Sequence, residues 1–198
     1  KRLDEIDSVR GQKLQILAQR NQNIFVGDQW VNEHRNMFHK PVLGPILTLI
    51  ECDDTNHQNY LQQSCKDIFF SAYIAQDPRD RDVLSARFKE LRLTVVNVDQ
   101  LTYREPDISH LQPLGITHRL DQTFRSDPVV KQVLIDGCGI DRTYVASPEM
   151  TGEQIEHVLK TTEVSRAFTP RTIFNKVKSR YSSEVGLSSS DVRQSRIF

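Results

Sequence analysis

Two segments of the chain share one pattern: a short apolar run, a turn that contains proline, and a stretch with helical spacing of apolar residues. The first is SAYIAQDPRDRDVLSARFKE, residues 71–90, and the second is RTYVASPEMTGEQIEHVLKT, residues 142–161. An apolar run followed by apolar residues at i, i+3 or i+4 indicates a strand and then an amphipathic helix. Few positions are identical, so the repeat is weak. It predicts two small α/β subdomains of similar design.

The remaining segments extend this alternation along the chain. Strands are expected at residues 46–50, 68–75, 93–98, 117–120 and 143–146, with extended chain at 173–185, and helices at 55–65, 78–91, 128–135 and 151–161. Residues 102–116 hold two prolines and a glycine, which is typical of a linker. These spacings predict an α/β (α+β) fold.

The first 38 residues are expected to form one polar helix. They contain no proline, and four apolar residues fall near heptad spacing: Leu14, Leu17, Ile24 and Val31. A helix with so thin an apolar face is not expected to pack into a globular core by itself. It is either a solvated terminal helix or the stub of a coiled-coil arm.

Composition narrows the class of protein. The chain has 26 basic and 26 acidic residues, but from Lys160 to the end eight basic residues face three acids, which allows a local anion-binding surface. No apolar run approaches the roughly 18 residues of a membrane span, and the polar N-terminus is no signal peptide, so no membrane association is expected. Three widely spaced cysteines favour reduced thiols in a cytosolic or nuclear protein. Because the chain begins without Met, it is expected to be a piece of a longer protein.

An acidic cluster follows the apolar run at 46–50. Asp53 and Asp54, with His57 close behind, could form a metal site, and a metal-assisted hydrolase is one alternative function. The other interpretation is a helix N-cap, because an aspartate there accepts hydrogen bonds from the free amides of the first turn. The Asp127–Pro128 step opens a later helix in the same way. Capping is favoured, since no further metal ligands and no nucleotide-binding or zinc-protease motif are found.

A basic segment near the C-terminus, FTPRTIFNKVKSRYSSEV, is the second candidate site. If residues 175–185 form a strand, Lys176, Lys178 and Arg180 share one face, and Val177, Ser179 and Tyr181 share the other. Cations interleaved with aromatic rings suit single-stranded nucleic acid, whose backbone needs neutralising and whose bases stack. The alternatives are a solvated face, or an edge strand that its lysines protect from aggregation.

The order of motifs along the whole chain resembles the hinge domain of structural-maintenance-of-chromosomes (SMC) proteins, over about residues 30–190. PVLGPILTLIECDD followed by HQNYLQQSC looks like the family's opening, and the segment that starts SAYIAQDPRD is similar to its next block. WVNEHRNMF, DPVV and SRYSSEVGLSSS look most like the fifth paralogue. The resemblance implies an arm stub at 1–38, hinge subdomain I at 39–101, a linker at 102–116, subdomain II at 117–190, and a returning segment at 191–198.

The resemblance also implies a function. The two subdomains would form a half-ring that pairs with the hinge of the sixth paralogue, in a nuclear, chromosomal complex for DNA repair by recombination that associates with single-stranded DNA. The hinge itself would catalyse nothing and would need no cofactor or small-molecule substrate, because the ATPase lies in other domains. The expected DNA-binding residues are Arg171, Lys176, Lys178 and Arg180. A self-dimerising structural spacer is the remaining alternative.

One departure from the family concerns the interface. Many hinges carry a glycine-rich motif where strands of two protomers meet, whereas this chain has only Gly186 there. Tyr181 is therefore expected to fill space that glycines leave open elsewhere. The expected interface residues are Tyr181, Ser182, Ser183, Val185 and Gly186.

Overall fold

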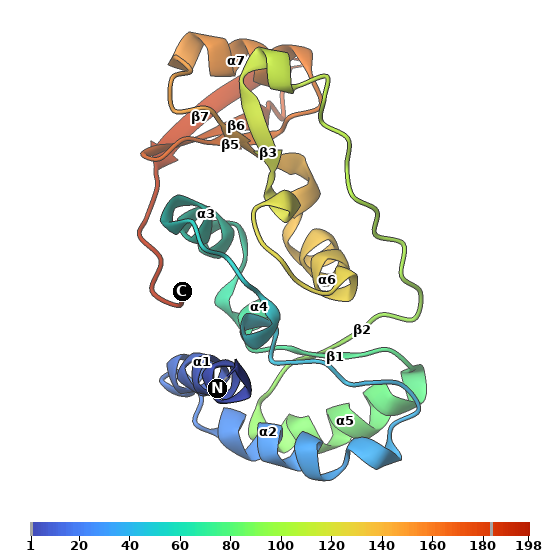
Figure 1. Ribbon diagram of the computed structural model, residues 1–198. Helices are drawn as coiled ribbons and strands as arrows, with labels where there is room; N and C mark the ends of the chain where they lie inside the picture. The colour runs from blue at the N-terminus through green and yellow to red at the C-terminus, as the bar shows by residue number, and fades with distance from the viewer. Residues whose placement is uncertain (1, 183) are drawn as a thin grey trace.

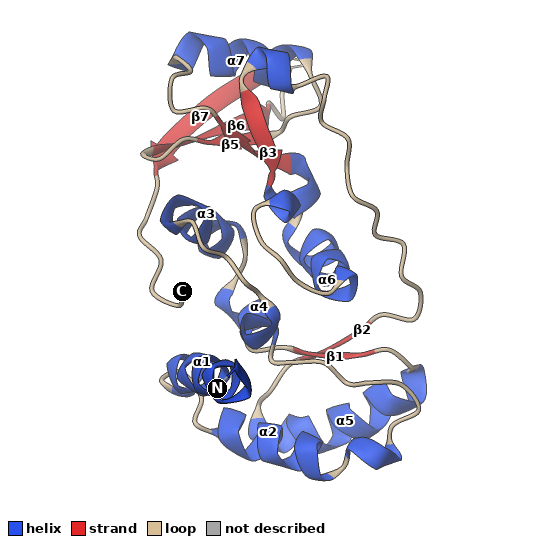
Figure 2. Ribbon diagram, in the orientation of Figure 1, coloured by secondary structure: helices blue, strands red, loops and turns tan. Residues whose placement is uncertain are grey.

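The chain folds around two sheets of different size, and the computed structural model describes residues 2–182 and 184–198. Figure 1 shows a two-stranded sheet with helices α1, α2 and α5 at one end of the molecule, and a larger sheet with α7 at the other. Helices α3, α4 and α6 lie between the two sheets. The mixture of helix and strand in Figure 2 confirms the predicted α/β class, whereas the boundaries of the two predicted subdomains remain a prediction.

The smaller sheet is a parallel pair joined by a helix. Strands β1 (Tyr73–Ala75) and β2 (Val95–Asn97) flank α5 (Pro78–Leu91), and Tyr73 pairs with Val95. The predicted helix at 78–91 is confirmed to the residue. Its first turn is capped by Asp77, which accepts a hydrogen bond of 2.9 Å from the amide of Arg79.

Two expected strands in this half are wrong. Most of the range 46–50 is a 3-10 helix, η2 (Ile46–Leu49), in which the carbonyl of Pro45 accepts hydrogen bonds from both the amide and the hydroxyl of Thr48, at 2.9 and 2.7 Å. Such local bonds from a threonine hydroxyl compete with strand pairing. The expected strand at 68–75 begins instead with the short helix α4 (Asp67–Phe70), and only its end forms β1.

The single polar helix expected at the N-terminus is also wrong. The chain forms two helices, α1 (Arg2–Ala18) and α2 (Asn23–Glu33), with a break where Asn21 accepts a hydrogen bond from the amide of Asn23 and donates one to the carbonyl of Leu91. The four apolar residues that fall near heptad spacing all lie in the main core, none more than 7% exposed: Leu14, Leu17, Ile24 and Val31. Folding back lets α1 pack against α2 and η2, and lets α2 pack against α5. The coiled-coil arm remains a prediction.

The larger sheet has the strand order β3-β4-β5-β6-β7. Its strands are β3 (Ile116–Arg119), β4 (Thr143–Ala146), β5 (Arg166–Phe168), β6 (Thr172–Lys178) and β7 (Val185–Asp191). The pair β4–β5 is parallel and the other three pairs are antiparallel. The strands expected at 117–120 and 143–146 are confirmed. Strands β5 and β7 are absent from the expected elements. The extended segment expected at 173–185 is a strand only as far as Lys178, where β6 ends, and its last residue begins β7.

Helices cover both faces of this sheet. Helix α7 (Gly152–Thr161) packs on one face through Ile155, Val158 and Leu159. Helices α3 (Thr55–Ser64) and α6 (Pro128–Cys138) lie on the other face and contribute to the main core. All three helices match their predicted ranges to within three residues.

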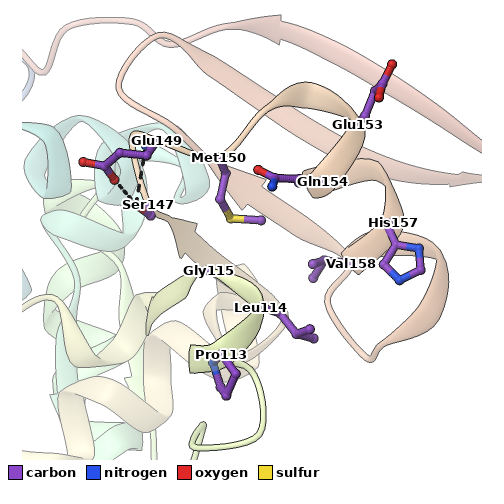
Figure 3. Close-up of a pocket in the computed structure, with 10 residues that line it drawn as sticks. All are labelled: Pro113, Leu114, Gly115, Ser147, Glu149, Met150, Glu153, Gln154, His157 and Val158. Atoms are coloured by element: carbon purple, nitrogen blue, oxygen red, sulfur yellow. Dashed lines mark hydrogen bonds between the residues drawn. The ribbon is translucent and has the colours of Figure 1, made fainter.

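Short 3-10 turns complete the chain: η1 (Arg35–Met37), η3 (Gln112–Leu114), η4 (Leu120–Gln122) and η5 (Ile140–Arg142). The linker expected at 102–116 is largely irregular, and it anchors Ile108 and Leu111 in the second core cluster. It ends at Gly115, whose φ of +99° suits glycine and whose backbone lies beside the side chain of Met150 (Figure 3).

Candidate interaction surface

Strand β7 forms an open edge of the five-stranded sheet. It pairs with β6 over all seven of its residues, from Val185 opposite Lys178 to Asp191 opposite Thr172, and it is last in the strand order. Every residue of β7 is exposed except the half-buried Leu187. A long exposed edge with neither proline nor lysine is a ready template for pairing with another chain, because the outward N–H and C=O groups of an edge strand have no partner within the sheet. At the C-terminal end of β7, the carbonyl of Asp191 accepts a 3.3 Å hydrogen bond from the side chain of Gln63 in α3.

The expected interface residues gather at one end of this edge. Val185 and Gly186 begin β7, and Tyr181 and Ser182 precede it; all four are exposed, and Ser183 lies outside the described residues. Tyr181 is 98% exposed, so it fills no space within its own chain. These four positions therefore lie on the surface of the described chain.

The expected DNA-binding residues are only partly brought together. Lys176 and Lys178 do share a face of β6, but Arg180 lies beyond the end of that strand, so the three-cation face is wrong. Lys176 is half-buried and donates a 3.1 Å hydrogen bond to the carbonyl of Thr162, while Arg171 precedes β6 and is exposed. Strand β6 lies between β5 and β7 in the strand order, but its pairing with β5 covers only residues 173–175, so Lys178 lies beyond that pairing.

A basic cavity that sequence reasoning missed lies at the far side of α3. It has a volume of about 720 Å³ and combines four cations from three distant segments with the amide side chains of α3: Arg20, Lys66, Arg193, Arg196, Asn59, Gln62 and Gln63. Asp67 lines it as well and pairs with Arg20. No ion pair between described residues involves Lys66, Arg193 or Arg196. Their positive charge therefore remains available to an anion.

The amides of α3 hold this cavity in shape. Asn59 Oδ1 accepts a 2.7 Å hydrogen bond from the amide of Ser195, and Gln62 Oε1 accepts one of 2.7 Å from the amide of Arg196. Gln63 Oε1 accepts a 2.8 Å bond from the amide of Arg193. The C-terminal segment is thus bound along α3 through its backbone. Its two arginines are held beside Lys66 by contacts that span more than half the chain, which no local pattern could reveal.

The acidic cluster after η2 is a cap and a surface ion pair. Asp54 accepts a 3.0 Å hydrogen bond from the amide of His57, which confirms the predicted N-cap of α3. Asp53 and Glu51 both pair with Arg125, at 2.9 and 3.1 Å. His57 is half-buried against the ring of His118, and burial lowers its pKa. Each of the three carboxylates therefore has a partner within the chain, and a cap with an ion pair accounts for the cluster without a metal.

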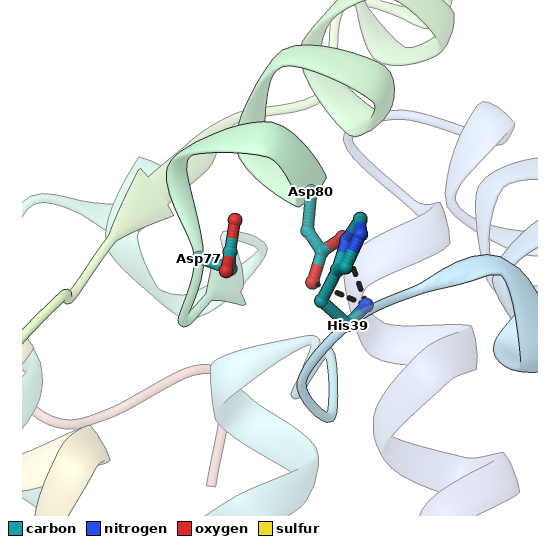
Figure 4. A group of neighbouring side chains, drawn as sticks. All are labelled: His39, Asp77 and Asp80. Carbon is teal, nitrogen blue, oxygen red and sulfur yellow. Dashed lines mark hydrogen bonds and ion pairs between the residues drawn. The ribbon is translucent and has the colours of Figure 1, made fainter.

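Another group of side chains brings metal-binding residue types together. In the described part of the chain, ligand atoms of His39, Asp77 and Asp80 lie within 4.8 Å of one another (Figure 4). Asp80 accepts hydrogen bonds from the amides of His39 and Lys40 and from the ring of His39. Burial raises the pKa of Asp80, but these hydrogen bonds outweigh it and leave the pKa lowered. The hydrogen bonds to Asp80 attach residues 39–40 to α5. The carboxylate of Asp77 accepts a hydrogen bond from the guanidinium of Arg79.

In the residues described, no helix combines the length and apolar character needed to cross a membrane.

Comparisons with known proteins bear on this fold. No family model matches the chain. Over 99% of its length the chain is 28% identical to Structural maintenance of chromosomes protein 5 of Arabidopsis thaliana, and it spans 19% of the length of that relative. The expected resemblance to the fifth paralogue is thereby confirmed.

Solved structures agree in fold. The crystal structure of the S. pombe Smc5/6 hinge domain superimposes with a TM-score of 0.81 at 14% identity, covering 100% of this chain and 78% of its own. An asymmetric dimer of the Geobacillus stearothermophilus SMC hinge domain gives a TM-score of 0.52 at 12% identity, covering 84% of this chain and 67% of its own. The chain therefore has the SMC hinge fold.

Proposed function

We propose that this chain is a heterodimerisation hinge, which pairs with the hinge of the sixth SMC paralogue through the edge of β7. The observation that carries the proposal is the seven-residue exposed edge strand, whose outer backbone groups another strand can satisfy. The Smc5/6 hinge likeness supports the identity of the partner. The role is non-catalytic, and any ATP hydrolysis belongs to other parts of the protein.

Side chains around the start of β7 support this pairing. Val177 and Val185, which are 45% and 42% exposed, place apolar surface beside the edge. A Cβ added to Gly186 would lie 3.6 Å from the carbonyl oxygen of Val177, which is an ordinary van der Waals distance, so the chain itself does not require glycine there. Its small size leaves room for a partner backbone to approach. Tyr181 then covers the adjoining gap.

The proposal includes association with single-stranded DNA on the chromosome, during repair by recombination in the nucleus. Two surfaces supply the positive charge that phosphates need: the basic segment with Arg171, Lys176, Lys178 and Arg180, and the basic cavity beside α3. The basic cavity is the better organised of the two, because the backbone that carries Arg193 and Arg196 is fixed by α3.

A charge placed on the edge strand tests the pairing. Val185→Lys adds an exposed cation where the partner strand would lie, and we expect it to weaken binding of the sixth-paralogue hinge by about tenfold or more, measured by titration calorimetry. Val83→Lys is the matched control, because Val83 is similarly exposed (39%) and belongs to α5, at the other end of the molecule from β7; it should change affinity less. Equal affinity for wild type and Val185→Lys would place the interface elsewhere.

A further inference from the structure

A groove with an apolar floor lies beside α7, on a part of the molecule that neither the edge of β7 nor the basic cavity includes. It has a volume of about 610 Å³. Figure 3 shows its three walls: the η3 turn, the connection from β4 to α7, and one side of α7. The side chains used below are Leu114, Glu149, Met150, Glu153 and Val158.

The floor of the groove is apolar and packs on the core beneath α7. Val158 is 2% exposed and belongs to the core beneath α7, while Leu114 is 41% exposed at the opposite wall. Met150 lies against Gly115 so closely that a Cβ there would stand 2.5 Å from its sulfur. Leu114 and Met150 both line the groove and give it apolar surface (Figure 3).

The rim of the groove is acidic. Glu149 and Glu153 line it together with the neutral Gln154 and with His157, and no lysine or arginine among the described residues does. The hydroxyl of Ser147 bonds to Glu149 and lowers its pKa, so this carboxylate is charged at neutral pH. Glu153 lies in the first turn of α7, where the helix dipole favours a negative charge. No ion pair between described residues involves either glutamate.

Hydrogen bonds fix the walls in place before any ligand arrives. The amide of Ser147 donates to the carbonyl of Gly115 at 2.8 Å, and the amide of Met150 donates to the carbonyl of Ser147 at 3.1 Å. Thr151 and Gln154 form a capping box that sets the start of α7. A preformed groove binds with little cost in conformational entropy.

We propose that this groove binds a short segment of a partner protein in which apolar side chains lie between lysines or arginines. The apolar side chains pack on Leu114 and Met150, and the flanking cations pair with Glu149 and Glu153. Charge complementarity selects such a segment over nucleic acid, because the two carboxylates repel phosphate. The site is therefore a protein-docking surface separate from hinge pairing and from DNA association.

Binding of a fluorescein-labelled peptide, KRLLRK, to the hinge tests the proposal. We expect fluorescence anisotropy to show saturable binding, and amide chemical shifts to change at η3 and in the first turns of α7. Glu153→Lys and Leu114→Ser should each weaken binding by about tenfold, because the first replaces a carboxylate that pairs with a cation of the peptide and the second removes apolar surface on which its leucines pack. Glu156→Lys is the matched control, because Glu156 is exposed on the same helix and does not line the groove.

Two further peptides separate recognition from simple charge attraction. EELLEE lacks the cations and KRGGRK lacks the apolar side chains, and we expect both to bind at least about tenfold more weakly than KRLLRK. The proposal is overturned if KRGGRK binds as well as KRLLRK, if Glu156→Lys weakens binding as much as Glu153→Lys, or if the chemical shifts map elsewhere. Unchanged circular dichroism and unchanged pairing with the sixth-paralogue hinge show that each variant is folded.

Discussion

The rings of Tyr60 and Phe168 stack with their centroids 4.6 Å apart and their planes 21° from parallel. Tyr60 belongs to α3 and Phe168 to β5, and both side chains are almost fully buried. A helix from the first half of the chain thus forms part of the core under the larger sheet, in the same cluster as the smaller sheet. The two halves share a core and are expected to unfold together.

Phe168→Ala tests this shared core. Removing a buried ring should lower the free energy of unfolding by about 3–5 kcal/mol, through lost burial and the cavity left behind. Urea unfolding followed by circular dichroism should keep a single transition. Tyr181→Ala is the control, because that ring is 98% exposed, and its effect should stay within about 0.5 kcal/mol. Two separate transitions in the wild type would contradict the account.

The N-cap of α3 gives a second prediction. Asp54→Ala removes the acceptor for the amide of His57 and should cost about 1 kcal/mol of stability. Asp53→Ala is matched to it in position and exposure but breaks only an exposed ion pair with Arg125, so it should destabilise the chain less than Asp54→Ala does. If the two variants were equally destabilised, the cap would have no special role.

His57 predicts a loss of stability on mild acidification. Its pKa in the folded chain is lowered from the ordinary value of 6.5, mainly by burial, so the unfolded chain binds the proton more readily. The contribution of neutral His57 to the free energy of unfolding is therefore fully present above pH 6.5. It is lost as the pH falls below that value, because the unfolded chain then takes up the proton first. His57→Gln should show a smaller fall in melting temperature between pH 7.5 and 5.5. Parallel profiles for wild type and variant would contradict this.

Salt dependence of DNA binding distinguishes the two basic surfaces. Arg193→Glu with Arg196→Glu should weaken binding of a single-stranded oligonucleotide and lower the salt slope by about 0.7 for each phosphate that is no longer neutralised. Lys176→Glu with Lys178→Glu should have the smaller effect, because Lys176 is already bonded to Thr162. Anisotropy titrations from low to moderate salt measure both. If a double variant keeps the affinity and the salt slope of the wild type, the two residues that it replaces do not bind DNA.

The sequence predicted best where structure is local. The caps at Asp54, Asp77 and Asp127 act within one helical turn, so their helices could be placed to within a few residues. Strand β7 was missed because its Gly-Leu-Ser-Ser-Ser run lacks the β-branched and aromatic residues that mark strands. Its backbone is held extended by pairing with β6 along its whole length.

Long-range interactions account for the other failures. The basic cavity draws Arg20, Lys66 and Arg193 from three distant segments, so no window of sequence contains it. Leu14 and Val31 lie near heptad spacing, which is equally compatible with a coiled coil and with two helices packed on a core. Two helices form because the chain breaks at Asn21. The side-chain amide of Asn21 donates a hydrogen bond to the carbonyl of Leu91, which is far along the chain.

The solution mass of the hinge, alone and mixed with the sixth-paralogue hinge, tests the central claim most directly. Light scattering should give a monomer of 22.9 kDa for the chain alone. The mixture should give a one-to-one complex that Val185→Lys weakens. A stable self-dimer that ignores the sixth-paralogue hinge would contradict the account and indicate a hinge that closes on a second copy of itself.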